Sequence, residues 1–187
     1  MNHLQYMGRA LLYRLRFPGS QIRIHPSSRI PWRCAIRINR GDTGTIRIGE
    51  NCWIEEYARL MTYGGSIVIG PRSSVNEFTV IRGGGGVTIG RGVRIGPHCV
   101  LSGISHRFDR TDIPLVEQGA VRRPIVVEDD VWIGAHSTII DGVTVRRGTV
   151  IGAGSVVTKD TPEYSLVAGC PARLIRSRKA ASGPAGA

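Results

Sequence analysis

The chain has 187 residues and a formal net charge of +11, with 25 glycines and only 6% aromatic residues. That length suits one domain with short appendages, and no apolar run approaches the ~18 residues of a membrane-spanning helix. The arginines are scattered and aromatics for base stacking are scarce, which argues against nucleic-acid binding and favours an anionic small ligand or an acidic lipid surface.

Residues 1–23 are predicted to form a short amphipathic helix and a lead-in to the main domain. Leucine and methionine alternate with Arg9, Arg14 and Arg16 over residues 1–17, which is a helical pattern. We expect this helix to cap the end of the domain, with contact to an acidic membrane as the alternative. It lacks the continuous apolar stretch and cleavage site of a secretory signal. We therefore expect a cytoplasmic protein, either free or membrane-associated.

From residue 24 onward an aliphatic residue recurs every six positions. Neither the helical period of 3.6 nor the strand period of 2 yields this spacing, whereas a six-residue repeat is typical of a parallel β-helix. Each hexad then supplies one short strand and one corner, and three hexads make a coil. The repeat residues are Ile24, Ile30, Ile36, Ile48, Ile54, Leu60, Ile69, Val75, Ile81, Ile89, Ile95, Leu101, Val127, Ile133, Ile139, Val145, Ile151 and Val157.

The intervals between repeat residues predict an all-β domain of about six stacked coils over residues 24–162. Val127 and Val145 are 18 residues apart, the length of a coil without insertion. Ile48 and Ile69 are 21 residues apart, which leaves room for a small corner loop. Glycine suits such corners because it adopts positive φ without a Cβ clash. At roughly 4.8 Å per coil the prism would be about 30 Å tall.

The fourth residue after each repeat residue is mostly small and should also point into the narrow interior. Cys34, Cys52 and Cys99 occupy such positions, so we interpret them as small buried hydrophobes. A disulfide framework is not expected in a chain of this size without a secretory signal. Cys170 lies outside the repeat, and the sequence assigns it no role.

The repeat breaks after Leu101 and resumes at Val127. The next position in phase is Arg107, whose charge excludes it from the core. We therefore predict an excursion loop at about residues 103–126, and a long loop in so regular a scaffold is usually functional. It contains one histidine, His106, which suits proton abstraction from a hydroxyl. On spacing alone, a solvated loop histidine is the other interpretation.

His98 and His136 occupy the same corner position in successive coils and should stack on one edge of the prism. A stacked histidine pair is also a candidate metal site, so a zinc carbonic anhydrase on this scaffold is an alternative function from another class. Such an enzyme needs three converging histidines. Because no third histidine is suitably placed, we predict two exposed corner residues and no metal.

Three C-terminal segments resemble a known family. Residues 131–143, 150–162 and 167–176 are similar to the corresponding parts of the hexapeptide-repeat O-acetyltransferases. Within that family they resemble the maltose, galactoside and nodulation-factor enzymes and those of capsule and exopolysaccharide clusters. The resemblance covers about residues 24–178. Its ending, Gly169-Cys-Pro-Ala-Arg-Leu-Ile-Arg176, is specific, whereas a single hexad is a weak signal.

The resemblance implies a left-handed parallel β-helix that assembles as a homotrimer, with active sites between neighbouring prisms. It implies acetyl-CoA as co-substrate and direct transfer of the acetyl group to a hydroxyl of a sugar or glycan. His106 matches the family's catalytic histidine and would act as general base, so no nucleophilic serine or cysteine is expected. Within the family, a xenobiotic or other small-molecule acceptor is the alternative.

The resemblance also assigns binding residues. Asn76 matches an asparagine of the acceptor pocket, but Phe78 stands where relatives often have a second asparagine. Residues 163–178 are expected on the coenzyme side, and residues 179–187 are expected to be disordered. For the glycine and the alanines among the coenzyme positions, corner geometry alone is the other explanation. The positions that match coenzyme contacts are Trp132, Gly134, Ala135, Ala153, Thr158, Lys159, Arg173 and Arg176.

Overall fold

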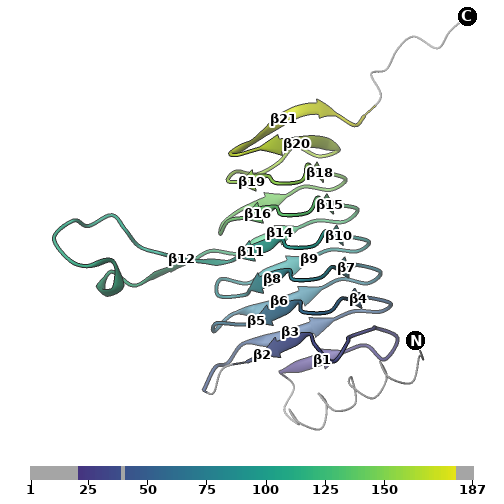
Figure 1. Ribbon diagram of the computed structural model, residues 1–187, viewed down its shortest axis with the longest axis horizontal. Helices are drawn as coiled ribbons and strands as arrows, with labels where there is room; N and C mark the ends of the chain where they lie inside the picture. The colour runs from purple at the N-terminus through teal and green to yellow at the C-terminus, as the bar shows by residue number, and fades with distance from the viewer. Residues whose placement is uncertain (1–20, 39–40, 180–187) are drawn as a thin grey trace, which may run out of the picture.

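The computed structural model describes residues 21–38 and 41–179. Its strands are short and stack into a tall prism, from which one long hairpin projects to the side (Figure 1). The helix predicted over residues 1–17 lies outside the described residues, as does the tail after Lys179. In the described part of the chain, no helix is long and apolar enough to cross a membrane.

Three sheets, named A, B and C, form the sides of the prism, and each coil visits them in that order. Sheet A contains β1 (Ile22–Ile24), β3 (Thr45–Ile48), β6 (Ser66–Ile69), β9 (Val87–Ile89), β14 (Ile125–Val127) and β17 (Thr144–Val145). Sheet B contains β4 (Trp53–Ile54), β7 (Ser74–Val75), β10 (Arg94–Ile95), β15 (Trp132–Ile133), β18 (Val150–Ile151), β20 (Ser165–Gly169) and β21 (Ala172–Ser177). Sheet C contains β2 (Ala35–Arg37), β5 (Arg59–Met61), β8 (Val80–Arg82), β11 (Val100–Ser102), β16 (Thr138–Ile139) and β19 (Val156–Val157). The corners are named A–B, B–C and C–A after the sheets that they join.

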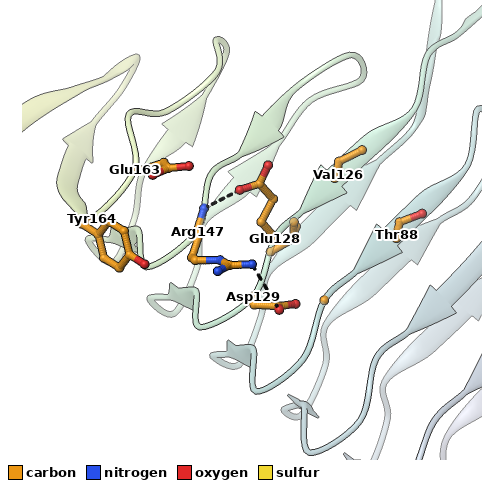
Figure 2. Close-up of a pocket in the computed structure, with 9 residues that line it drawn as sticks. Thr88, Val126, Glu128, Asp129, Arg147, Glu163 and Tyr164 are labelled. Atoms are coloured by element: carbon orange, nitrogen blue, oxygen red, sulfur yellow. Dashed lines mark hydrogen bonds and ion pairs between the residues drawn. The ribbon is translucent and has the colours of Figure 1, made fainter.

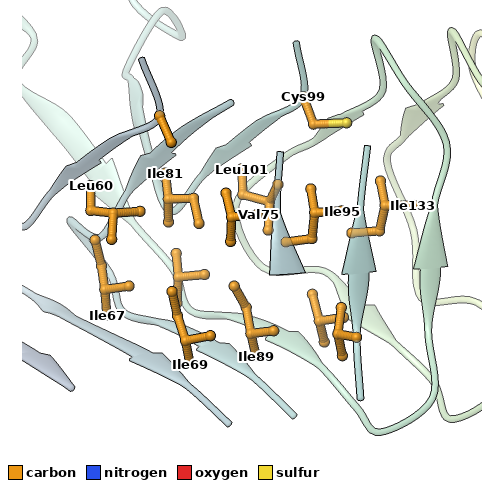
Figure 3. Packing of buried hydrophobic residues seen from close by; sticks show 14 of the residues in the cluster. Leu60, Ile67, Ile69, Val75, Ile81, Ile89, Ile95, Cys99, Leu101 and Ile133 are labelled. Carbon is orange, nitrogen blue, oxygen red and sulfur yellow. The ribbon is translucent and has the colours of Figure 1, made fainter. Parts of the chain in front are cut away.

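The six-residue repeat generates this architecture, as predicted. Repeat residues pair across the coils, so that on sheet A Ile48 aligns with Ile69 and Ile69 aligns with Ile89. Their side chains are buried and form aliphatic ladders along the prism (Figure 3). The first coil is in phase, since Ile24 pairs with Ile48. The fold is therefore a parallel β-solenoid of about six coils.

The small residues that follow each repeat residue also point inward, as predicted. Cys52 and Cys99 are fully buried, and burial raises the pKa of both thiols. Hydroxyl groups at equivalent positions connect neighbouring coils. The Thr79 hydroxyl donates to the Gly96 carbonyl at 2.9 Å and accepts from the Cys99 amide at 3.2 Å. The interior therefore combines aliphatic packing with polar groups whose hydrogen bonds are satisfied.

The excursion leaves the prism at the C–A corner as a two-stranded hairpin. Its strands, β12 (Ile104–His106) and β13 (Ala120–Arg122), pair antiparallel, and the short 3-10 helix η1 (Leu115–Glu117) lies between them. The strand after the hairpin, β14, keeps its register, because Val127 pairs with Ile89 of the preceding coil. The hairpin is thus inserted without shifting the stack.

The distal part of the hairpin is held by its own side chains. Arg110 forms an ion pair with Asp112, with Nε to Oδ1 at 2.9 Å, and this contact lowers the pKa of the Asp112 carboxyl. The Gln118 side-chain amide donates to the Arg110 carbonyl at 2.7 Å and accepts from the Arg110 amide at 3.0 Å. Phe108 and Val116 are 74% and 84% exposed, so the tip of the hairpin presents apolar side chains outward.

The last two strands extend sheet B at the C-terminal end of the prism. β20 pairs parallel with β18 and antiparallel with β21. Cys170 is exposed in the turn between β20 and β21, and the peptide bond that joins it to Pro171 is cis. The strand order does not define the hand of the solenoid, and left-handedness stays a prediction.

Candidate functional site

The residues singled out in the sequence occupy two separate parts of the prism. Asn76 follows β7 and Trp132 lies in β15, so both belong to sheet B or its B–C corner. His106 is on the hairpin at the C–A corner, and Thr158 and Lys159 follow β19 to that same corner. Figure 1 shows the hairpin leaving the prism on the side away from β7, β10 and β15. The path of one chain therefore does not bring His106 to Asn76.

His106 is the last residue of β12, and its side chain is exposed. It lies opposite Ala120. Just beyond it the Arg107 amide donates to the Gly119 carbonyl at 3.1 Å, so the backbone pairing continues past the histidine. Within the described residues, the His106 ring makes no hydrogen bond. An imidazole held on a paired strand and open to solvent can take a proton from an incoming group.

Asn76 is half-buried at the start of the B–C corner. Its side-chain Nδ2 donates to the carbonyl of Ile95 on the next coil at 2.8 Å, and its backbone amide donates to the same carbonyl at 3.1 Å. These contacts hold the side chain against the neighbouring coil. The amide oxygen is left to accept a hydrogen bond from a ligand hydroxyl.

Glu55 lies one coil before Asn76 in the same corner position, and it was not among the predicted site residues. Its carboxyl pKa is raised, chiefly by burial and then by the charges of Glu77 and Glu56, while Arg29 acts in the opposite direction. A perturbed carboxyl beside a candidate acceptor pocket is a functional-site signal. The available sequence clue was positional, because Glu55 follows Ile54 as Asn76 follows Val75.

We expect Glu55→Gln to raise the melting temperature at neutral pH. Because the pKa of Glu55 in the folded chain lies above its ordinary value of 4.5, the ionised carboxyl opposes folding. Stability is then lost as the pH rises through the folded-state pKa, and the glutamine variant avoids that loss. Thermal melts of both proteins across the acid-to-neutral range would check this. Below the ordinary pKa the two should converge, and the exposed Glu117→Gln serves as the matched control. Equal melting temperatures at neutral pH would contradict the prediction.

A column of stacked rings runs along the B–C corner. It is formed by Tyr57, Phe78, His98 and His136, whose successive ring centroids are 4.9, 4.8 and 4.7 Å apart. All four residues have φ between 58° and 62°, a left-handed conformation that is uncommon outside glycine. The predicted stacking of the two histidines is confirmed. Phe78 lies in this column and stacks on both Tyr57 and His98, which gives its aromatic ring a structural role.

The stacking of His98 and His136 is unfavourable for the zinc site considered as an alternative. The rings of His98 and His136 stack with an interplanar angle of 2°, so the two ring planes do not converge. Tetrahedral zinc needs ligands that converge on one point. Within residues 21–38 and 41–179, no group of three or more histidine, cysteine, aspartate or glutamate side chains is placed to hold a metal ion.

The outer surface of sheet B carries the middle part of the predicted coenzyme path. Trp132 is 56% exposed, and its strand lies between β10 and β18. Gly134 is buried, and a Cβ there would lie 2.6 Å from the Ala153 nitrogen, so coil packing alone explains this glycine. Ala135 is half-buried and Ala153 is exposed. Their small side chains leave the corner backbone accessible to a ligand.

Within the described residues, three cations near the C-terminal end have no carboxylate partner. Arg173 and Arg176 are exposed on β21, and Lys159 is exposed at the C–A corner. Among the ion pairs of the residues that the structure describes, none includes these three side chains. The guanidinium groups of Arg173 and Arg176 donate to carbonyls of adjacent residues, at 3.0 and 3.3 Å. Such cations suit the phosphates of a nucleotide-containing ligand.

A surface hollow of about 500 Å³ lies elsewhere, at the A–B corner (Figure 2). None of the predicted site residues lines it. Its carboxylates hold coils together, because Glu128 accepts from the Arg147 amide at 2.8 Å and pairs with Arg146 at 3.2 Å. Asp129 pairs with Arg147 at 3.7 Å. We therefore place the candidate site on sheet B and on the hairpin rather than in this hollow.

The later coils match a family model, and the chain has curated relatives. Residues 124–159 match the model described as the hexapeptide repeat of succinyl-transferase. The galactoside O-acetyltransferase of Escherichia coli is 40% identical over 130 residues, which are 69% of this chain and 62% of that protein. The chain spans 50% to 62% of the length of the first curated relatives that it matches.

Solved structures share the fold. A hexapeptide-repeat-containing acetyltransferase from Vibrio cholerae, solved with acetyl-CoA, is 36% identical with a TM-score of 0.56, and the match covers 74% of this chain and 72% of that one. An N-acyltransferase from Bacillus cereus was solved with dTDP-4-amino-4,6-dideoxyglucose and coenzyme A. It is 25% identical with a TM-score of 0.75, over 90% of this chain and 89% of that one.

Proposed function

This chain belongs to the hexapeptide-repeat acetyltransferases, and on that premise we propose that it transfers an acetyl group from acetyl-CoA to a hydroxyl of a sugar or glycan. The observation that carries the proposal is His106, an exposed imidazole on a hairpin that leaves an otherwise regular prism. Acetyl-CoA, when bound, supplies the reactive thioester. His106 takes the proton of the acceptor hydroxyl and so makes its oxygen a better nucleophile.

The proposed coenzyme path runs along sheet B toward the C-terminal end of the prism. Trp132 offers an exposed ring, and the corners at Ala135 and Ala153 are open enough for an extended chain to approach the backbone. Arg173 and Arg176 would bind the phosphates, with Lys159 as a further cation. The absence of carboxylate partners for these three side chains in the described part of the chain supports this assignment.

We also propose that the active site is shared between copies of the chain in a homotrimer. His106, Thr158 and Lys159 lie at the C–A corner, whereas Asn76 and Trp132 lie on sheet B and its B–C corner. One site that uses both groups needs the C–A corner of one prism beside sheet B of a neighbour. The apolar residues at the hairpin tip, Phe108 and Val116, would then contact the neighbouring copy.

An amine of an amino sugar is the second candidate acceptor. Glu56 and Glu77 lie close to Glu55 at the corner that holds Asn76, and after burial their charges raise the pKa of the Glu55 carboxyl. An ammonium group would relieve that repulsion. The similarity to the N-acyltransferase that was solved with an amino-sugar nucleotide supports the same possibility of an amine acceptor. Ester formation and amide formation therefore need to be distinguished by experiment.

The decisive experiment is an acceptor screen with acetyl-CoA, in which release of the free thiol reports turnover. We expect thiol release with sugars or glycans and an acetylated product detectable by mass spectrometry. Treatment of the product with mild alkali removes an acetyl ester and leaves an acetamide, which separates the two acceptor classes. Thiol release that does not depend on any acceptor, or turnover of non-sugar drugs alone, would contradict the proposed substrate class.

A further inference from the structure

The position of His106 depends on how the hairpin leaves the prism. Ile104 pairs with Arg122 at the base of the hairpin, and His106 pairs with Ala120 two residues further out. At roughly 3.3 Å per residue, the histidine lies about 7 Å beyond the base pair. A change in the angle at the base would therefore displace the imidazole relative to the rest of the site.

Arg122 ties the hairpin base to the two preceding coils. Its guanidinium Nη1 donates to the carbonyl of Tyr63 and, at 3.4 Å, to the carbonyl of Gly84. Tyr63 is itself held in place, because the guanidinium of Arg82 lies 4.9 Å from the centre of its ring. The arginine thus connects the return strand of the hairpin to two corner loops at the C–A corner.

Arg123 ties the base in the opposite direction along the prism axis. Its Nε donates to Oδ2 of Asp141 at 3.0 Å. The Asp141 side chain is only 7% exposed, whereas that of Arg123 is 64% exposed. Asp141 belongs to the coil that follows the hairpin, so adjacent arginines brace the base from both sides.

Two glycines allow the hairpin base to pack closely against the preceding corner. A Cβ on Gly84 would lie 2.7 Å from Cβ of Ile104, and a Cβ on Gly85 would lie 2.5 Å from backbone atoms of Arg123. Neither glycine has a φ in the left-handed region. Their missing side chains therefore serve close approach of the hairpin rather than a turn conformation.

We propose that Arg122, Arg123, Gly84 and Gly85 are positioning residues that fix the hairpin angle and thereby hold His106 where the acceptor binds. The proposal rests on the proposed role of His106 as general base. It follows from the geometry because Arg122 and Arg123 join the hairpin base to neighbouring coils, while Gly84 and Gly85 lie directly against that base. All four residues lie at the C–A corner, away from the candidate coenzyme residues of sheet B. A misplacement of about 1 Å in a catalytic group can cost about 100-fold in rate.

Arg122→Met tests the proposal because it keeps the apolar part of the side chain and removes the guanidinium. We expect kcat to fall by about 10- to 100-fold, with the KM for acetyl-CoA and the melting temperature nearly unchanged. Arg122→Lys, which keeps one donor for the carbonyls, should recover most of the loss. Arg147→Met, which removes an arginine paired across coils at the A–B corner, is the matched control and should keep the wild-type kcat.

Hydrogen exchange gives a readout that does not depend on catalysis. We expect the amides of β12 and β13 to exchange faster in Arg122→Met than in the wild type, and the stacked coils to be unaffected. Unchanged hairpin exchange, or an unchanged kcat in a protein whose His106→Ala variant is inactive, would overturn the positioning role. A further outcome is that His106→Ala stays active while hydrogen exchange in the hairpin still rises in Arg122→Met. That result would refute the general-base role of His106 and would show that Arg122 stabilises the hairpin without a catalytic consequence.

Gly85→Ala provides a second variant with a matched backbone clash elsewhere. At the A–B corner a Cβ on Gly70 would lie 2.6 Å from backbone atoms of Gly90, so Gly70→Ala strains the stack to a similar degree away from the hairpin. We expect both variants to melt at lower temperatures and only Gly85→Ala to lose kcat beyond what its folded fraction explains. Equal losses of kcat in the two variants would contradict the proposal that Gly85 positions the hairpin.

Discussion

Replacement of His106 by alanine is expected to lower kcat by about 10²- to 10⁴-fold, the range that a positioned general base typically contributes. The side chain is exposed at the end of β12, so its removal should change the melting temperature little. Steady-state rates of thiol release from acetyl-CoA, measured with the best acceptor from the screen, would check this. Added imidazole should restore part of the rate if the missing group is the proton acceptor.

The control is His25→Ala, which makes the same chemical change on an exposed residue of the first coil. Within the described residues the His25 ring bonds only to neighbouring Ser27, so its loss should leave kcat unchanged. A His106→Ala protein that keeps wild-type turnover would refute the general-base role. A large loss of rate accompanied by unfolding would equally argue that the residue is structural.

Mixed assemblies should regain activity that neither parent variant has. His106→Ala disables the C–A corner, and a Trp132→Ala, Arg173→Glu double variant disables sheet B. If each site takes its histidine from one chain and its sheet B residues from the next, an equal random mixture contains intact sites. Half of the chains supply an intact corner and half an intact sheet, so about a quarter of the wild-type activity is expected.

The matching control mixes two variants that are damaged at the same corner. His106→Ala and Lys159→Glu both alter the C–A corner, so no arrangement of these chains restores an intact one, and the mixture should stay inactive. Co-expression with two affinity tags, followed by tandem purification, isolates the mixed trimers for assay. Each purified trimer of the first mixture has one intact site of three, so about a third of the wild-type activity is expected after this step. Absence of activity in the first mixture as well would mean that each site lies within a single chain.

The six-residue repeat predicted the fold well because it identifies the side chains that must be buried inside the prism. Each repeat residue must be buried, and parallel pairing then sets the register, so even the alignment of Ile89 with Val127 across the excursion follows from the phase of the repeat. The small inward positions were predicted for the same reason. The narrow interior limits side-chain volume, and this constraint is visible in the sequence.

The outer surface was harder to predict because the repeat does not constrain it. The stacking of His98 with His136 was expected from their equivalent corner positions, but its continuation through Phe78 to Tyr57 was missed. Those coils differ in length, so equivalent corners are not evenly spaced along the chain. Glu55 was missed because its raised pKa depends chiefly on burial and then on neighbouring charges such as Glu77 in the next coil, neither of which the repeat specifies. The braces at the base of the hairpin were hidden for the same reason, since Arg122 contacts residues about 40 to 60 positions earlier in the sequence.

The preserved register across the hairpin allows the inserted segment to vary in evolution while the coils stay the same. Val127 pairs with Ile89 in the register that a coil without an insertion would have. The stacking of the coils therefore does not depend on the length or sequence of the inserted hairpin. A hairpin of another size could be inserted between Gly103 and Pro124 without a change in any coil, provided that its base packs against Gly84 and Gly85. The hairpin and the stacked coils are then structurally separable, so the segment that carries His106 can vary while the candidate coenzyme residues of sheet B stay unchanged.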